Sequence, residues 1–361
     1  MARHAVALSG GVDSAVAAAL LAAEGHELLA LTLNLGTASG SCAGPADVEA
    51  AARVADQLGL QHEIINHGAH FEQAVIGPFV DAYAAGLTPN PCVCCNATVK
   101  FGLLLDLAAE RGCEALATGH YARCEPAADG GWRLRRGTDP RKDQSYVLHA
   151  LSQDQLARVR WPLGGFDKAR TRALAAELGL VAAERPDSQD LCFAANGHAA
   201  FVVARRPEAG QPGAIVDGDG RVLGTHRGVA WYTVGQRRGL GLARAEAWIV
   251  VELRAASREV VVAPLDEAGW TDFALAPTGE PTPRRLLSPK LAALAQVRYR
   301  MMVRPCQASG VGERVVQVRL DQPMTGIAPG QAAVLYDQQG YVLLGGPILV
   351  AQDAMTEESA R

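Results

Sequence analysis

The first third of the chain alternates short apolar runs with amphipathic segments, and this alternation restricts the fold more than any other feature. The apolar runs at 4–8, 27–35, 62–67 and 114–120 are typical of buried strands. Helices are expected between them, from about Asp13, near Pro45, from Ala69 and after an Asn96 cap. Short connections between strands and helices predict an α/β fold with a parallel sheet covered by helices on both faces. Ligands of such sheets bind at the carboxyl ends of the strands.

A change of pattern after about residue 204 predicts further domains. A chain of 361 residues is longer than one typical core requires. We predict an α/β domain over 1–204, a small central domain over 205–275, a C-terminal β-barrel over 276–355 and a disordered tail over 356–361. The central region contains a hairpin pattern around an Asp-Gly turn. The Pro-rich stretch 276–285 is typical of a linker.

The composition argues against membrane proteins and against disulfide-stabilised secreted proteins. No apolar run reaches the roughly 18 residues that a membrane helix needs, and the N-terminal stretch lacks a secretory pattern. We therefore expect a cytoplasmic protein without a membrane partner. Eight cysteines in a reducing compartment are not expected to form a structural disulfide framework. Some should be buried apolar residues, and others should be chemically reactive.

The charge is uneven along the chain. The net charge of −4 gives no overall field that would attract nucleic acid. Basic residues nevertheless cluster in two places, at Arg133, Arg135, Arg136, Arg141 and Lys142, and at Arg298, Arg300 and Arg304. Such clusters are either local phosphate-binding patches or solvated surface, and charge alone does not decide between these readings.

The hexapeptide SGGVDS, residues 9–14, lies between the first predicted strand and the first helix. Its two glycines allow the backbone to approach an anion, and the amides at the helix start favour phosphate. Ser9 and Ser14 add hydroxyl donors, while Asp13 could hold Mg²⁺ or cap the helix. The alternative is a tight turn with a serine cap. The loop resembles the pyrophosphate-binding loop of the N-type ATP pyrophosphatases, which have the adenine nucleotide alpha hydrolase-like fold. That superfamily adenylates a substrate oxygen and releases pyrophosphate.

Three cysteines lie in four positions of TPNPCVCCN, residues 88–96. A thiol with a pKa of about 8.5 is mostly protonated at neutral pH, and a helix N-terminus lowers that pKa. Cys95 immediately precedes the predicted Asn96 cap, so position favours Cys95 as the reactive thiol. Cys192, in the polar segment PDSQDLCF, is a second candidate. Two separated reactive thiols suit sulfur transfer, in which one carries a persulfide and the other attacks it.

A series of sequence blocks in a fixed order supports a more specific resemblance. These blocks are TPNPCVCCNATVKF, TGHYA, KDQSY, DSQDLCF, GQRRGLG, VRYR and APGQAAVLYD. Together they resemble the tRNA-specific 2-thiouridylase family across nearly the whole chain. The resemblance implies a catalytic ATP-pyrophosphatase domain, a small central domain and a C-terminal β-barrel. It also implies 2-thiolation of the wobble uridine in tRNAs for Lys, Glu and Gln.

The resemblance assigns roles to individual residues. Cys95 matches the family's nucleophile and Cys192 its persulfide-bearing cysteine. The ATP-binding positions are Ala7, Leu8, Ser9, Gly10, Gly11, Val12, Asp13, Ser14, Leu33 and Gly119. The positions beside the target base are Asn90, Pro91 and Cys92. The tRNA contacts are His120, Lys142, Asp143, Gln144, Arg298, Tyr299 and Gln331. Two departures stand out, because many members have Asp at position 92, and the segment NLGTASGSCAG lacks the Lys-Asn-Trp common in relatives.

The implied reaction uses ATP with Mg²⁺, a tRNA and an upstream persulfide carrier protein, and a monomer is expected. O2 of uridine attacks the α-phosphate, and a persulfide on Cys192 then supplies sulfur. Either Cys95 releases hydrosulfide, or the persulfide attacks C2 and Cys95 closes a disulfide with Cys192.

Three alternatives stay open at this point. The Cys92-x-x-Cys95 spacing with Cys192 could hold a labile iron–sulfur cluster. The chain could instead adenylate a different RNA base or a small metabolite, or it could be an ATP-sensing RNA-binding module without catalysis.

Overall fold

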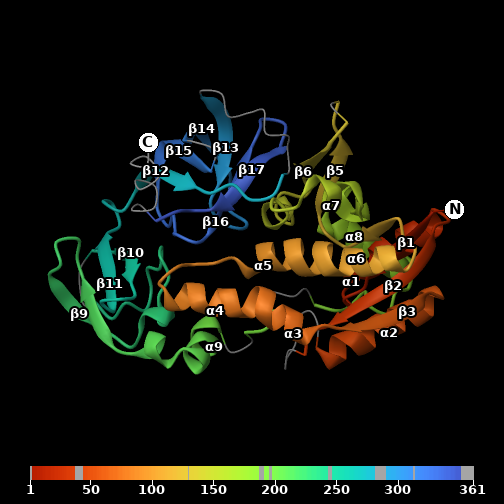
Figure 1. The fold of residues 1–361 in the computed structure, drawn as a ribbon, viewed down its shortest axis with the longest axis horizontal. Helices are drawn as coiled ribbons and strands as arrows, with labels where there is room; N and C mark the ends of the chain where they lie inside the picture. Colours follow the sequence, from red (N-terminus) through yellow and green to blue (C-terminus); the bar gives the residue numbers. More distant parts are fainter. Residues whose placement is uncertain are drawn as a thin grey trace.

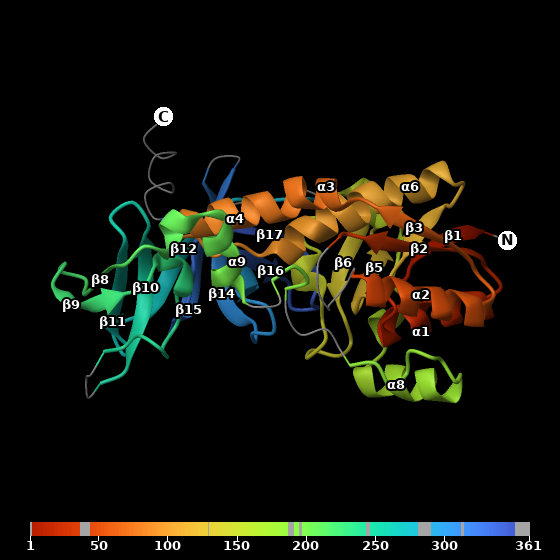
Figure 2. The same ribbon diagram turned by 90° about the horizontal axis from the view of Figure 1, so that it is seen from below.

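The structure is a computed structural model, which describes residues 2–36, 44–128, 130–186, 191–194, 197–242, 246–280, 290–311 and 314–350. It contains a parallel sheet covered by helices, a central sheet and a C-terminal sheet (Figures 1 and 2). The expected tail at 356–361 lies outside the described residues.

The N-terminal sheet has five strands in the order β3-β2-β1-β4-β7, and all neighbours are parallel. The strands are β1 (Arg3–Ala7), β2 (Glu27–Asn34), β3 (Gln61–Asn66), β4 (Ala115–Ala117) and β7 (Val159–Arg160). Alternate residues of β1 and β2 face opposite sides. Ala5 and Leu29 pack in one core cluster, while Val6 and Ala30 pack in another that contains helices α1 (Val12–Ala23) and α2 (Pro45–Leu58). The predicted parallel sheet with helices on both faces is confirmed.

A helix of 20 residues, Pro91–Glu110, crosses the middle of the molecule (Figure 1). It consists of α5 (Pro91–Cys94), a π-helical stretch (Cys95–Leu103) and α6 (Leu104–Glu110). The prediction that Asn96 caps this helix is wrong. Asn90 is the N-cap, and its side-chain oxygen accepts a hydrogen bond from the Cys92 N–H at 3.2 Å. Pro91, which lacks an N–H, suits the first helical position. Asn96 is buried instead and donates to the Val147 carbonyl.

This helix is long and apolar enough to cross a membrane by length and composition alone. One such helix is weak evidence, because a core helix meets the same criteria. Phe101, Leu104, Leu105 and Ala108 are buried in the core cluster that contains the sheet residues Leu29 and Leu116. Packing inside the protein therefore accounts for the apolar composition.

The central part is a four-stranded sheet in the order β10-β11-β8-β9. Its strands are β8 (Gly213–Val216), β9 (Val222–His226), β10 (Trp248–Arg254) and β11 (Glu259–Pro264). The expected hairpin around the Asp-Gly turn is present as the antiparallel pair β8 and β9. The sheet shares a core cluster with α4 (Gly77–Ala84) and α9 (His198–Arg205).

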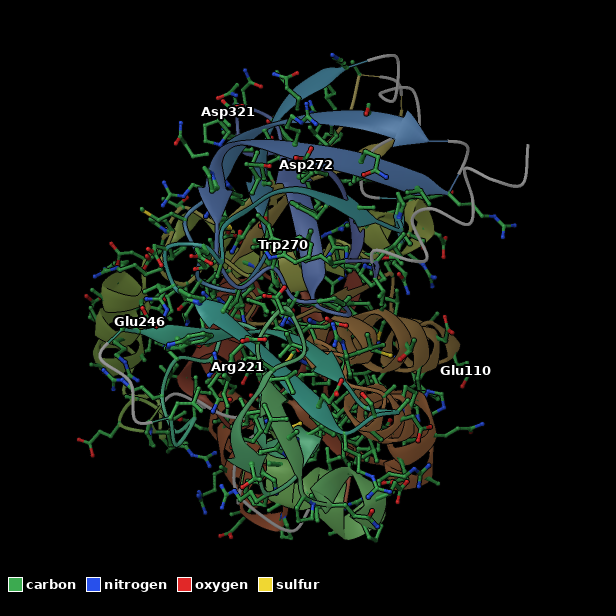
Figure 3. The ribbon with its side chains drawn as sticks, turned by 90° about the vertical axis from the view of Figure 1, so that its left-hand side faces the viewer. Glu110, Arg221, Glu246, Trp270, Asp272 and Asp321 are labelled. Atoms are coloured by element: carbon green, nitrogen blue, oxygen red, sulfur yellow. The ribbon has the colours of Figure 1, made fainter. Side chains whose placement is uncertain are left out.

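The C-terminal sheet has six antiparallel strands in the order β12-β15-β14-β13-β16-β17. They are β12 (Trp270–Leu275), β13 (Leu291–Gln296), β14 (Arg304–Val311), β15 (Val315–Met324), β16 (Ala332–Tyr336) and β17 (Val342–Pro347). The boundary predicted at 275/276 separates β12 from this sheet, whereas β12 pairs with β15. Asp272 of β12 lies among these strands (Figure 3) and accepts a hydrogen bond from Arg319 at 2.7 Å.

A hairpin of β5 (Ala122–Pro126) and β6 (Trp132–Arg136) joins the first and last parts of the chain. Arg133 pairs with Asp337 at 2.9 Å, and its guanidinium lies 3.8 Å from the centre of the Tyr341 ring. Arg136 pairs with Asp143 at 2.6 Å. These two arginines of the first basic cluster therefore fasten the hairpin to its neighbours. The remaining elements are α3 (Gly68–Phe71), the π-helical Glu72–Ile76, α7 (Gln153–Ala157), α8 (Lys168–Glu177) and short 3₁₀ turns at Ser145–Val147, Pro162–Gly165, Pro207–Gly210 and Val229–Trp231.

Candidate active site

The glycine loop follows β1 and leads directly into α1. Gly11 is the N-cap of that helix, and Gly10 has a φ of +73°, which favours glycine. The Ser14 hydroxyl donates to the Gly11 carbonyl at 3.0 Å and accepts from the Ser9 N–H at 3.2 Å. Ser14 thus holds the loop in shape through contacts inside it, and the backbone amides at the start of α1 remain the main anion-binding feature.

Asp13 does not cap the helix. Both of its carboxylate oxygens contact the Lys168 ammonium, at 2.7 and 2.9 Å, and the Tyr121 hydroxyl donates to one of them at 2.7 Å. The Tyr121 hydroxyl also lies 3.0 Å from the Thr171 hydroxyl, so α1 and α8 are joined at this point. The Asp13 charge is balanced by a lysine side chain that is itself mostly buried.

Gly119 follows β4 and lies against the glycine loop. A Cβ at this position would come within 2.6 Å of the Asp13 carbonyl carbon and 2.7 Å of the Ser14 nitrogen. Leu33 is near the carboxyl end of β2, which neighbours β1 on its other side. The structure therefore brings the predicted ATP-binding residues together at one edge of the sheet, where parallel sheets bind ligands.

Two charged residues at this edge were missed by sequence reasoning, Lys168 and Arg185. Arg185 donates to the Gly10 carbonyl at 3.0 Å and pairs with Asp47 of α2 at 2.9 Å. Neither residue belongs to a motif that the sequence singled out, and both reach the loop from more than 150 positions away along the chain. Only tertiary structure reveals these contacts.

The thiol segment forms the start of the long helix rather than a loop before it. Cys92 is exposed and occupies the first turn, whereas Cys95 lies in the second turn. The helix dipole acts mainly on the first turn, so the positional argument favours Cys92 and not Cys95. The position of Cys95 in the helix therefore no longer supports its assignment as the nucleophile, which the resemblance implies. Cys94 donates to the Ala74 carbonyl at 2.9 Å, as expected of a packing residue.

A change of helix type occurs at Cys95. The backbone passes there from α-helical to π-helical hydrogen bonding, which continues to Leu103. Stretches of π-helix are rare and are frequent at functional sites. This irregularity adds to the evidence that Cys95 has a function.

Cys192 lies in the short described segment 191–194, while the rest of its motif, 187–190, lies outside the described residues. The Phe193 ring packs against the rings of Phe71 and Phe79, with centroid separations of 5.9 and 5.1 Å. Cys95 and Cys192 pack against the same core cluster, to which those two phenylalanines belong. The structure thus brings the two predicted catalytic cysteines onto one apolar cluster, although about a hundred positions separate them.

A second group of predicted residues meets where the long helix approaches the C-terminal sheet. The buried Tyr146 hydroxyl donates to the Gln331 side chain at 3.2 Å, and its ring lies 6.3 Å from that of Tyr299. Burial raises the pKa of Tyr146, and nearby Arg298 and a hydrogen bond with Asn90 oppose the rise. Burial also raises the pKa of Tyr299.

The surroundings of Tyr299 link this group to the thiol helix. Arg300 opposes the rise in the Tyr299 pKa, whereas negative charge on Asp143 and Cys92 adds to it. Residues predicted beside the base, Asn90 and Cys92, therefore neighbour the predicted tRNA contacts Arg298 and Tyr299.

The remaining predicted tRNA contacts form hydrogen bonds inside the protein. His120 is buried 2.6 Å from the Thr118 hydroxyl, and burial, with a contribution from Lys100, holds its pKa well below the usual value. Asp143 is 6% exposed and accepts from Arg136, as well as from the N–H groups of Gly137 and Ser145. The Gln144 side chain accepts from the Tyr121 N–H. Lys142 is partly exposed.

Family models match three successive parts of the chain. Residues 2–196 match the tRNA methyl transferase HUP domain, 199–264 the tRNA methyl transferase PRC-barrel domain and 280–349 the aminomethyltransferase beta-barrel domain. Their order agrees with the parallel sheet, the central sheet and the C-terminal sheet.

Curated relatives match almost the whole chain. A protein of Geobacter metallireducens is 44% identical over 98% of both chains. One of Sinorhizobium fredii is 44% identical over 94% of this chain and 88% of its own, and one of Paracoccus denitrificans is 42% identical over 95% and 90%. All three are named tRNA-specific 2-thiouridylase, whereas two domain descriptions name a methyl transferase. Matches at this identity and coverage decide between the two names, and the chain belongs to the tRNA-specific 2-thiouridylase family.

Proposed function

We propose that this protein catalyses the ATP-dependent 2-thiolation of the wobble uridine in tRNAs for Lys, Glu and Gln. The observation that carries the proposal is 44% identity over 98% of both chains to a relative named for this activity. The meeting of Asn90 and Tyr299 at Tyr146, and the packing of Cys95 and Cys192 against one core cluster, support it.

The first step activates the base. ATP binds with its β- and γ-phosphates on the amides of the glycine loop, where the positive end of the α1 dipole favours anions. O2 of the uridine attacks the α-phosphate, and the bond to the bridging oxygen breaks with release of pyrophosphate. The product is a uridine whose C2 carries an adenylate leaving group. Lys168 keeps the nearby Asp13 carboxylate neutralised, which reduces its repulsion of the triphosphate.

The second step transfers sulfur from a persulfide on Cys192, which an upstream carrier protein supplies. In one route, the Cys95 thiolate attacks Sγ of Cys192, and the hydrosulfide that leaves attacks C2. In the other, the terminal sulfur attacks C2 directly, and Cys95 then attacks Sγ of Cys192 to release the thiolated base. AMP leaves in both routes, and both end with a Cys95–Cys192 disulfide that a cellular dithiol must reduce.

The described residues do not offer a ready site for a metal. They contain no group of three His, Cys, Asp or Glu side chains placed to hold an ion, although Cys92, Cys95 and Cys192 are all among them. The Asp13 oxygens are engaged by Lys168 and Tyr121. We therefore derive no step through an iron–sulfur cluster, and we propose that Mg²⁺ enters with ATP, held by the phosphates.

The direct test is reconstitution. The protein is incubated with ATP, Mg²⁺, a persulfide donor and unmodified tRNA for Glu, and the nucleosides are analysed for 2-thiouridine. We expect thiolation together with AMP and pyrophosphate formation. Release of pyrophosphate without any 2-thiouridine would indicate adenylation of another target, and binding of tRNA without pyrophosphate release would contradict catalysis. Anaerobic purification with iron and sulfide analysis tests the cluster separately. The proposal further includes a monomer in the cytoplasm.

A further inference from the structure

We propose that Arg185 is a positioning residue of the nucleotide site, which fixes the Gly10–Gly11 peptide so that its N–H faces the phosphates of ATP. This inference rests on the proposed function, because it assigns the glycine loop to ATP. The two ends of the Arg185 guanidinium make different contacts. One nitrogen donates to the Gly10 carbonyl at 3.0 Å, and another pairs with Asp47 at 2.9 Å.

The planar Gly10–Gly11 peptide fixes the direction of the Gly11 N–H once the Gly10 carbonyl is held. In a trans peptide the C=O and the following N–H point in opposite directions. Because Arg185 holds the Gly10 carbonyl, the N–H of Gly11 points away from Arg185. A charged donor on the carbonyl also polarises the peptide and makes its N–H a stronger donor.

The second contact keeps Arg185 itself in place. Asp47 is 8% exposed, and its other oxygen accepts from the Gly44 N–H at the start of α2, at 3.2 Å. On the other side, Arg172 of α8 donates to the Arg185 and Ala183 carbonyls at 3.3 and 3.2 Å. Arg185 is thus held by α2 and α8, and the glycine loop contacts a guanidinium that is fixed in position.

Gly10 shows how closely the loop fits this support. A Cβ on Gly10 would lie 2.6 Å from the Arg185 guanidinium and 2.8 Å from both the Ala50 side chain and the Asp47 carbonyl oxygen. Any larger residue would push the loop away from Arg185 or force a change in φ. The close contact and the hydrogen bond therefore specify the same loop position.

A hollow of about 230 Å³ lies beside Arg185, so we expect that this side chain can be truncated without unfolding the protein. Gly10, Arg53 and Val181 are among the residues that line it, and the Arg185 side chain is about one-third exposed. If Arg185 is truncated, water can reach the Gly10 carbonyl, so the loss should affect the direction of the peptide more than the fold. Arg53 lines the same hollow but pairs with Glu49 at 2.7 Å, which makes it a matched control.

The experiment measures binding of a non-hydrolysable ATP analogue to the full chain, and KM for ATP and for tRNA in the thiolation assay. We expect R185A to weaken analogue binding and raise KM for ATP by about tenfold. KM for tRNA should stay within twofold, R185K should restore part of the affinity, and R53A should match the wild type. Binding by R185A within twofold of the wild type, at an unchanged melting temperature, would overturn the proposal. If R185A does not fold, the same comparison is made with R185K and D47N, of which at least one must weaken binding. A wild type that binds no analogue would instead refute the proposed function.

Discussion

The glycine loop and the cysteine site are built in different ways. In the loop, local residues and neighbouring strand ends supply most of the structure, since Ser9, Gly11 and Ser14 bond to one another and Gly119 follows the adjacent strand. The cysteine site is assembled over a distance. Cys95 comes from the long helix and Cys192 from a segment held by Phe193 on the Phe71 and Phe79 rings.

This difference predicts that the two steps of the reaction can be separated. A change in the loop should impair nucleotide binding and thereby both steps. A change at the cysteine site should leave adenylation intact, because the hydrogen bonds described above for the loop are made by Ser9, Gly11, Ser14 and Arg185 and not by a thiol. Substitutions at the two sites test whether the two steps separate, and their expected effects decrease in the order given.

Loss of either predicted catalytic thiol should have the largest effect. In C95A and in C192A we expect 2-thiouridine formation to fall by at least about 10³-fold, because the proposed mechanism assigns the attacking thiol to Cys95 and the persulfide to Cys192. Pyrophosphate release with tRNA should persist. C94A is the control, since the Cys94 thiol donates to the Ala74 carbonyl and lies 3.9 Å from the Thr98 hydroxyl, and it should stay within twofold. Full thiolation by either single variant would refute the thiolase mechanism.

Substitution of Gly119 should impair ATP binding at the glycine loop. The added methyl group in G119A would lie 2.6 Å from the Asp13 backbone, so the loop must shift. We expect ATP affinity and the rates of both steps to fall together by about 100-fold. A Cβ at Gly165 has nothing within 4 Å, so G165A provides the matched control. If G119A lost thiolation but kept normal pyrophosphate release, the proposed separation would be wrong.

Removal of the Lys168 charge should weaken ATP binding by a smaller factor. In K168M the Asp13 carboxylate loses its cation and repels the triphosphate, so we expect ATP affinity to fall by about tenfold. The second change D13N should recover part of this loss. Arg170 on the same helix pairs with Glu177, and R170A should bind ATP normally. Equal ATP affinity in K168M and the wild type would show that the Asp13 charge does not reach the phosphates.

The aromatic anchor beside Cys192 should matter for sulfur transfer alone. In F193A the ring contacts with Phe71 and Phe79 are lost, so Cys192 is held less firmly. We expect single-turnover thiolation to slow by about fivefold, while tRNA-dependent pyrophosphate release is unchanged. The melting temperature shows whether the variant is folded. An equal decrease in both rates would contradict the separate construction of the two sites.

Reactivity toward an alkylating reagent should distinguish the exposed Cys92 from Cys124 and Cys306, whose pKa is raised by burial. Burial raises the pKa of Cys124 and of Cys306 to about 12, so both are protonated below that pH and form thiolate only above it. We expect brief alkylation at pH 8 to label the exposed Cys92 and to leave Cys124 and Cys306 unlabelled in the folded protein. Mass spectrometry of the digested protein measures this. Rapid labelling of Cys306 would mean that its core cluster opens readily.

The sequence predicted what depends on local pattern. The parallel sheet follows from apolar runs separated by helices, and the position of SGGVDS after β1 follows from its place between a strand and a helix. The predicted ATP-binding residues lie at the carboxyl ends of the strands, because parallel strands place these ends together.

Local pattern misled us where tertiary contacts override it. Asn96 has the chemistry of an N-cap, but Asn90 with Pro91 starts the helix earlier, and Asn96 bonds to Val147 in the interior. Charge alone left the role of the first basic cluster open, and the folded chain brings acidic partners near Arg133 and Arg136. Lys168 and Arg185 carry no local signal, so only the packing of α8 and α2 against the loop identifies them.

The core cluster that unites the hairpin with β16 has a consequence for synthesis of the protein. Leu134 and Tyr146 are buried together with Val334, Tyr336 and Val342, which the ribosome adds about 200 residues later. During translation, the sheet and the glycine loop are complete long before these last partners emerge. A nascent chain would therefore expose this apolar face, which favours capture by chaperones until the C-terminal strands arrive. The surface that gathers Asn90, Tyr146 and Gln331 forms only after the segment that contains Gln331 has emerged.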